Sequence, residues 1–375
     1  MSQSVRIPIT NINMDGDYTG AITVGTGSAA RTLNVILDTG SSALAVNGDK
    51  YSPQLGNGTT ATNLAQFDAY GDGSNWLGSV LKDTVKIGNV TGSSVAVAVT
   101  YQESANMFRE ADGILGLAYQ ALDDAYSLPE STWPKKYSKS QVEHGTRSSV
   151  IPCLMQLANE GVLQEKMAFL TRRSFCKAGV DPDNDPLNQG VLILGGGEEA
   201  TDLYSGDFQI AAVLADAWYS TNLLSVGVGT EQFPISARPQ PGMPSNSIVD
   251  SGTNTLVLGP TIINGILSRL QVNQQELLKT SMSGQPVSVT SLDLSQWPPI
   301  SFTLQGISGG QNVALSVPPQ IYWQIDAPAV GQAMAAISPV RQDGGAILGL
   351  PLMNGYFTIF DGTAGLGVIK FAAAK

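Results

Sequence analysis

The stretch that decides the fold is LNVILDTGSS, residues 33–42, in which a short apolar run ends in an aspartate, a hydroxyl residue and a glycine. Leu33, Val35 and Leu37 alternate with their neighbours as residues of a half-buried strand do, so Asp38 stands at a strand end. An isolated Asp-Thr-Gly triplet is usually a surface turn, because Asp and Gly are ordinary turn residues. The apolar run before Asp38 favours a functional carboxylate.

The same pattern returns later in the chain. NSIVDSGTNT, residues 246–255, again places an apolar run before an aspartate, Asp250, and follows it with Ser-Gly. A second motif is also duplicated in the same order, as ADGILGLAY at Ala111–Tyr119 and GGAILGLPL at Gly344–Leu352. Two motifs that each occur twice in matching order indicate an internal repeat.

Composition agrees with a mostly β protein built from two related lobes. Hydrophobic residues make up 42% of the 375 residues and charged residues 14%, with 41 glycines and 20 prolines, which is typical of a turn-rich β chain. We expect a bilobal, mostly antiparallel fold with few short helices and a cleft between the lobes. The boundary is predicted between an N-terminal lobe, 1–200, and a C-terminal lobe, 201–375, with one aspartate in each.

Local patterns predict a few further elements. Helical spacing of apolar residues predicts helices near 151–158 and after Pro260. Short strands are expected at 193–197 and 357–360, and loops at 237–244 and at 120–149, where a polar stretch of weak periodicity is typical of a surface insertion.

Charge and residue usage exclude several classes of function. A net charge of −11 argues against a nucleic-acid partner, and no apolar run is long enough to cross a bilayer. The single histidine, His144, lies in a polar segment and leaves no residues for a two-histidine zinc site. The start of the chain shows no secretory signal, and Cys153 and Cys176 favour two free buried thiols over a disulfide, so a cytoplasmic protein is expected.

Two facing carboxylates carry a definite chemistry. Asp38 and Asp250 at an interface between lobes would not both ionise, so they would share one proton over an acidic range. The ionised member can act as general base on a water molecule, and the protonated member can donate to a substrate carbonyl. Pepsin is the standard example of such a pair.

The two triplets supply three further pairs of matching residues. These are Thr39 and Ser251, Gly40 and Gly252, and Ser41 and Thr253. We expect the first pair to hydrogen-bond across the interface and the glycines to permit a tight turn with room for substrate. The third pair is placed to hydrogen-bond the outer carboxylate oxygens, which favours the ionised form.

With these motifs the chain resembles the pepsin family of aspartic peptidases over nearly its whole length. YGDGS, residues 70–74, resembles the family's flap, which closes over bound substrate, so the resemblance implies substrate contacts for Tyr70, Gly71 and Asp72. The two Ile-Leu-Gly motifs resemble stretches that support the catalytic loops from below. The resemblance implies an acid-optimal, pepstatin-sensitive endopeptidase that prefers hydrophobic residues at the scissile bond, acts as a monomer and needs no metal or cofactor.

Two departures from the family pattern stand out. Ala45 takes the place of a tryptophan that usually hydrogen-bonds the flap tyrosine, a role that Trp76 could fill. The absent family disulfides, signal and prosegment resemble the bacterial homologues called shewasins. A catalytically silent pepsin-fold binding or inhibitor protein remains the alternative. An all-β carbohydrate-binding protein is disfavoured, because sugar binding would not require two such triplets. A retroviral-type homodimer is disfavoured, because both triplets lie in one chain.

Overall fold

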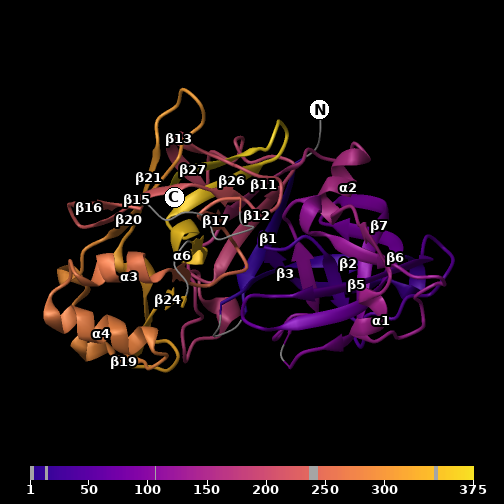
Figure 1. Cartoon of the computed structure of the whole chain (residues 1–375), viewed down its shortest axis with the longest axis horizontal. Coiled ribbons are helices and arrows are strands. Elements are labelled where there is room, and N and C mark those ends of the chain that lie inside the picture. Colours follow the sequence, from indigo (N-terminus) through magenta and orange to yellow (C-terminus); the bar gives the residue numbers. More distant parts are fainter. Residues whose placement is uncertain (1–3, 13–15, 106, 236–243, 342–344) are drawn as a thin grey trace.

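The computed structural model describes residues 4–12, 16–105, 107–235, 244–341 and 345–375. Strands dominate it and the longest helix has 11 residues, which confirms the predicted mostly β fold with few short helices. In Figure 1 the early strands and helices α3 and α4 lie on opposite sides of the molecule, with α6, β26 and β27 between them. The loop expected at 237–244 lies almost wholly outside the described residues.

In the described part of the chain the largest sheet runs through both sides of the molecule. Its strands in spatial order are β10 (Thr146–Ser149), β9 (Asp124–Ser127), β5 (Thr60–Ala69), β6 (Asn75–Ile87), β7 (Val90–Glu103), β4 (Leu44–Asn47), β8 (Gly113–Gly116), β3 (Arg31–Asp38), β2 (Tyr18–Val24), β1 (Val5–Asn11), β12 (Gln189–Leu194), β11 (Lys166–Leu170), β26 (Tyr356–Asp361), β27 (Val368–Ala374) and β13 (Tyr204–Ala212).

Smaller sheets and short helices complete the later part of the chain. The sheets are β14 (Ser220–Thr221), β17 (Ser247–Val249), β25 (Ala346–Leu348), β18 (Leu256–Leu258) and β24 (Ile337–Pro339); β16 (Glu231–Pro234), β15 (Leu223–Val228), β20 (Ile300–Leu304) and β21 (Val313–Val317); and β19 (Val287–Ser288), β23 (Gln332–Ala335) and β22 (Trp323–Ile325). The helices are α1 (Lys139–Glu143), α2 (Cys153–Asn159), α3 (Pro260–Leu267), α4 (Val272–Met282), α5 (Pro319–Tyr322) and α6 (Leu350–Met353), with single 3-10 turns at Gly27–Ala29, Gln120–Leu122, Pro182–Asn184, Val289–Ser291 and Leu294–Gln296.

The internal repeat of the sequence is also a repeat of topology. Strand β3, which ends at Asp38, pairs in parallel with β8, the first Ile-Leu-Gly strand, and β4 pairs antiparallel with β8. Strand β17, which leads to Asp250, pairs in parallel with β25, the second Ile-Leu-Gly strand, and β18 pairs antiparallel with β25. In each half, therefore, the triplet aspartate lies at the end of an apolar strand that pairs in parallel with the Ile-Leu-Gly strand.

The last strands of the chain join the two halves. Strand β26 pairs with β11, and β27 pairs with β26 and β13, so the last two strands of the chain lie between two strands from the middle of the sequence. The lobe boundary at residue 200 stays a prediction. Lys166 on β11 and Lys370 on β27 both pair with Asp361, at 3.0 and 2.7 Å, and with Glu198, so four charged side chains link these strands.

Most local predictions are confirmed. Helix α3 begins with Pro260 as its first helical residue, and α2 ends before Gly161, which adopts a positive φ of 71°. The strand expected at 193–197 is shifted, because β12 ends at Leu194 and the glycines after it form a turn.

The polar segment 120–149 carries more structure than its sequence predicted. It forms β9, α1 and β10 at the edge of the large sheet, where β9 pairs with β5. Ala125 and Val142 are fully buried in it, together with nearby Leu128. A few well-placed apolar residues are enough to pack an otherwise polar segment against a sheet edge.

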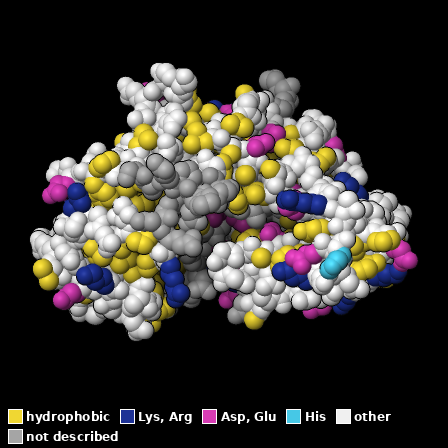
Figure 2. Space-filling view, in the orientation of Figure 1, with side chains coloured by type: hydrophobic (Ala, Val, Ile, Leu, Met, Phe, Trp, Pro, Cys, Tyr) yellow, Lys and Arg dark blue, Asp and Glu magenta, His cyan; other side chains and the backbone are white. Residues whose placement is uncertain are grey.

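Histidine and cysteine behave as expected. His144 is exposed, and its Nδ1 forms a local hydrogen bond with the Ser140 carbonyl. Figure 2 shows it on the outer surface. Cys153 and Cys176 are both buried and free, which confirms the expectation of two unpaired thiols. On the face seen in Figure 2, positive and negative side chains are scattered rather than gathered by sign.

Candidate active site

The two aspartates lie together at the centre of the molecule, each held by its own loop in the same way. The Asp38 carboxylate accepts hydrogen bonds from the Gly40 backbone N–H at 2.7 Å and from the Ser41 hydroxyl at 2.5 Å. Asp250 accepts from the Gly252 N–H at 2.9 Å and the hydroxyl of Thr253 at 2.6 Å. These bonds orient both carboxyl groups before any substrate arrives.

The residues after the aspartates interlock across the interface. The Thr39 N–H donates to the Ser251 hydroxyl at 3.0 Å, and the Ser251 N–H donates to the Thr39 hydroxyl at 2.8 Å. Each hydroxyl then donates to the strand that carries the opposite aspartate, Ser251 to the Leu37 carbonyl at 2.8 Å and Thr39 to the Val249 carbonyl at 3.2 Å. This reciprocal set fixes the two loops relative to each other.

The glycines of the triplets are required by the close approach of the loops. A Cβ atom at Gly252 would lie 2.3 Å from Oδ1 of Asp38, and one at Gly40 would lie 2.8 Å from the carboxyl atoms of Asp250. Any side chain at either position would push the opposite carboxylate away.

The two carboxyl groups share a buried environment. Asp38 has 5% and Asp250 has 7% of its surface exposed. Burial, and next the negative charge of Asp250, raise the pKa of Asp38 well above its ordinary value, against the opposing hydrogen bonds of Ser41 and Gly40. Two such carboxyl groups titrate as a pair, which keeps one proton over a range of acidic pH.

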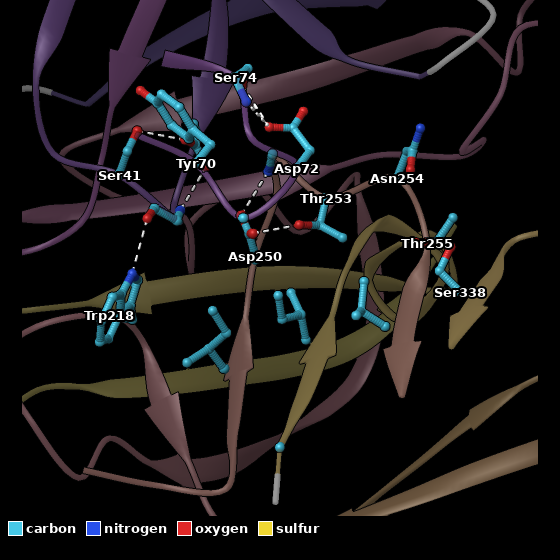
Figure 3. A pocket seen from close by; sticks show the side chains of 18 of the residues that line it. Ser41, Tyr70, Asp72, Ser74, Trp218, Asp250, Thr253, Asn254, Thr255 and Ser338 are labelled. Carbon is cyan, nitrogen blue, oxygen red and sulfur yellow. Dashed lines mark hydrogen bonds between the residues drawn. The ribbon is translucent and has the colours of Figure 1, made fainter. Parts of the chain in front are cut away.

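The predicted flap is the tight turn between β5 and β6. Its turn is closed by a hydrogen bond from the Tyr70 N–H to the Ser74 carbonyl at 2.8 Å, and the Asp72 carboxylate accepts from the N–H and hydroxyl of Ser74 at 2.8 and 2.6 Å. Tyr70, Gly71 and Asp72 all line the cleft above the aspartates. In Figure 3 the Tyr70 ring lies over the loop of the first aspartate, beside Ser41.

Trp76 takes over the role that the sequence assigned to it. Its indole Nε1 donates to the Tyr70 hydroxyl at 3.2 Å, and the ring is fully buried. It packs in one apolar cluster with Ala45, whose small side chain provides the room for a tryptophan that enters from the neighbouring hairpin. Tyr70 is thus held by an indole from β6 instead of one from β4.

A cleft of about 920 Å³ runs over the two aspartates. Its apolar lining near Asp38 includes Ile36, Met107 and Ile114, and near Asp250 it includes Ile248 and Ile347. Figure 3 looks into this cleft and shows polar side chains, among them Asn254, Thr255 and Ser338, along the side formed by the second half of the chain.

Several residues of the cleft were not predicted from the sequence, among them Trp218 and Asp68. Trp218 donates from its indole Nε1 to the Gly40 carbonyl at 3.1 Å and so supports the first loop from the second half of the chain. Asp68 also lines the cleft. It could have been found, because residues two apart on a strand face the same side and Tyr70 was already assigned to the flap. No sequence motif marks Trp218.

The described ranges, 4–12, 16–105, 107–235, 244–341 and 345–375, show neither a metal centre nor a membrane-spanning helix. In these ranges no three His, Cys, Asp or Glu side chains converge as metal ligands do. None of the helices traced there combines the length and the apolar character that crossing a bilayer requires.

Comparison with known proteins gives one consistent result. The family model described as eukaryotic aspartyl protease matches residues 17–374. The chain is 25% identical to pepsin A of Bos taurus over 94% of its length and 83% of the relative, and 26% identical to pepsin A of Canis lupus familiaris over 93% and 79%. It is also 24% identical to a beta-secretase of Strongylocentrotus purpuratus over 91% of this chain and 64% of that one.

Proposed function

The chain belongs to the eukaryotic aspartyl protease family and is an aspartic endopeptidase, and we propose that Asp38 and Asp250 carry its reaction. The observation that supports this assignment is the matched set of hydrogen bonds that holds two buried carboxyl groups against each other across the cleft. The proposal makes peptides or proteins the substrates.

The different protonation of the two groups defines their roles. The Asp250 carboxylate takes a proton from a water molecule as that water attacks the scissile carbonyl carbon. Asp38, whose pKa is raised by burial and by its neighbour, donates its proton to the carbonyl oxygen. Breakdown of the tetrahedral intermediate returns a proton to the leaving amine and yields a carboxylic acid and an amine. No bond forms between the enzyme and the substrate.

The substrate would lie extended in the cleft with bulky hydrophobic residues on both sides of the scissile bond. Ile36, Met107 and Ile114 form an apolar wall beside Asp38, and Ile248 and Ile347 form one beside Asp250. Tyr70 on the flap would close over the bound chain and exclude water from the reacting groups.

The test is cleavage of a quenched fluorogenic peptide with two central hydrophobic residues, between about pH 3 and pH 7, with and without pepstatin. We expect fastest cleavage at acidic pH and complete inhibition by pepstatin. A folded protein that cleaves nothing at any pH would instead support the silent-homologue alternative, and a rate that is flat from acid to neutral pH would contradict the shared proton.

The shewasin-type grouping, a monomeric state and a cytoplasmic location also belong to the proposal. The pair of free thiols supports the grouping and the location, since burial raises the pKa of Cys153 and of Cys176 to about 12 and keeps both unreactive, as suits a reducing compartment. Thiol titration of the denatured protein without reductant should find both thiols. A disulfide, or a dimer in sedimentation analysis, would contradict this part.

A further inference from the structure

A third carboxylate of the cleft, Asp68, has no part in the reaction described above. It lies on β5, two residues before Tyr70, and its carboxylate accepts a hydrogen bond from the Ala69 N–H at 2.9 Å. It lines the cleft and is only partly exposed. Because this carboxylate lines the cleft, a substrate side chain that lies beside it would contact it.

The surroundings of Asp68 form a defined part of the cleft. Asp68, Tyr70, Ser41 and Trp218 all line the cleft, and Trp218 donates to the carbonyl of Gly40, the residue before Ser41. Leu122 lines the cleft and also, with Asp68, a small cavity of about 110 Å³ behind it. We call Asp68, Leu122 and Trp218 the Asp68 subsite.

The charged side chains near Asp68 are carboxylates that have partners of their own. Asp124 on β9 adds negative charge but is paired with Arg147 at 2.5 Å. The Asp123 carboxylate accepts a hydrogen bond from Nε2 of Gln66 at 2.5 Å. The positive charge of Lys82 stabilises the anionic form of Asp123. In the described parts of the chain no lysine or arginine forms an ion pair with Asp68.

We propose that the Asp68 subsite selects a basic side chain of the substrate, lysine or arginine, next to the hydrophobic residues at the scissile bond. The inference rests on the proposed function and names a substrate class for the same cleft. The aliphatic part of such a side chain would pack on Leu122, and its cationic end would reach the Asp68 carboxylate with the Trp218 ring nearby. A half-buried carboxylate gains more from such a pair than an exposed one does.

The preference should depend on pH in a characteristic direction. Burial raises the pKa of Asp68 to about 6, ahead of the smaller contribution of Asp124. Asp68 is then largely neutral where cleavage is fastest and becomes anionic as the pH rises. The ratio of rates for basic and neutral substrates should therefore increase with pH, although the absolute rates fall.

The experiment uses pairs of fluorogenic peptides that share the hydrophobic scissile pair and differ by lysine or glutamine at one flanking position. At one of these positions we expect lysine to be preferred about tenfold in kcat/KM near pH 6 and much less near pH 4. Asp68→Asn, which keeps the shape and can still accept from the Ala69 N–H, should abolish the preference. Asp207→Asn makes the same change at an exposed position on β13 and should retain it. The absence of a lysine preference at every position, or its survival in Asp68→Asn, would overturn the inference.

Binding separates this inference from the proposed reaction. The same peptides are titrated into Asp38→Asn protein and into Asp38→Asn/Asp68→Asn protein. Tighter binding of the lysine peptide by the first protein alone supports the subsite even if the wild-type enzyme cleaves no peptide, a result that would count against the proposed function only. Equal binding of both peptides by both proteins overturns the subsite.

Discussion

At the scale of single residues, the site depends on short hydrogen bonds whose partners are adjacent to the aspartates in sequence. The Ser251 hydroxyl accepts from the Thr39 N–H and donates to the Leu37 carbonyl, and all three groups are buried. Removing that hydroxyl would leave both backbone groups without a partner, whereas threonine would keep both bonds.

We therefore expect Ser251→Ala to lower the free energy of unfolding by about 1–3 kcal/mol, and Ser251→Thr to stay close to wild type. Urea unfolding of the two variants, followed by tryptophan fluorescence, measures the difference. Equal stability of the two variants would show that the reciprocal bonds do not hold the loops together.

The Ser41 hydroxyl gives a prediction about pH. Its hydrogen bond opposes the rise in the pKa of Asp38. Without the bond that pKa rises further, and because the reaction needs Asp38 protonated, the alkaline limb of kcat/KM moves to higher pH in Ser41→Ala. Ser74→Ala, a matched change in the flap turn that does not touch Asp38, should leave the limb in place. A limb that moves to lower pH in Ser41→Ala would contradict the assignment.

Residues close in sequence were predictable and residues brought together by folding were not. The partners of Asp38 lie two and three positions along the chain, so the triplet itself indicated them. Trp218 hydrogen-bonds the Gly40 carbonyl from the other half of the chain, and no motif around Trp218 predicts that contact. The rise in the pKa of Asp38 comes first from burial, which no motif encodes.

At the scale of elements, the flap hairpin and the strand after it act as one unit. Trp76 lies on β6, immediately after the turn, and its indole N–H binds Tyr70 while its ring fills the space beside Ala45. Both Ala45, in place of the usual tryptophan, and Trp76, its replacement, could be found from the sequence. Ala45 follows the first Asp-Thr-Gly triplet closely, and Trp76 follows the flap motif closely. The folded edge formed by β9, α1 and β10 was not predicted, since its burial depends on β5.

Two substitutions separate packing from hydrogen bonding at Trp76. Trp76→Phe loses the N–H but keeps most of the ring, so we expect lower kcat/KM with a stability loss below about 1.5 kcal/mol. Trp76→Ala also opens a cavity and should cost about 3–5 kcal/mol. Peptide cleavage and thermal unfolding are measured for both. Full activity in Trp76→Phe would show that Tyr70 needs no indole partner.

At the scale of the whole molecule, the two halves are joined by strands near the end of the chain. Asp361 on β26 forms ion pairs there with Lys370 on β27 and Lys166 on β11, and both lysines also pair with Glu198 in the turn after β12. Against the desolvation that opposes it, the hydrogen bonds of Lys370, Thr363 and Lys166 hold the pKa of Asp361 well below its ordinary value. The repeat predicted two related halves, but the joining strands carry no motif and became visible only in the structure.

A depressed pKa in the folded state stabilises the protein above the unfolded-state pKa, and this contribution fades as the pH falls toward the folded-state value. We expect Asp361→Asn to lose about 1–3 kcal/mol of unfolding free energy near neutral pH and much less near pH 2. Denaturant unfolding at several pH values measures the loss, with exposed Asp207→Asn on β13 as the control. A loss that grows toward low pH would contradict the ion-pair explanation.

The central claim is that Asp38 and Asp250 together carry out peptide hydrolysis. It is tested most directly by kcat/KM for one fluorogenic peptide at the acidic optimum, compared among wild type, Asp38→Asn, Asp250→Asn and the exposed control Asp207→Asn, with circular dichroism to confirm folding. We predict a loss of at least about a thousandfold in each active-site variant and unchanged activity in the control. A folded Asp38→Asn or Asp250→Asn protein that retains wild-type activity would contradict the account.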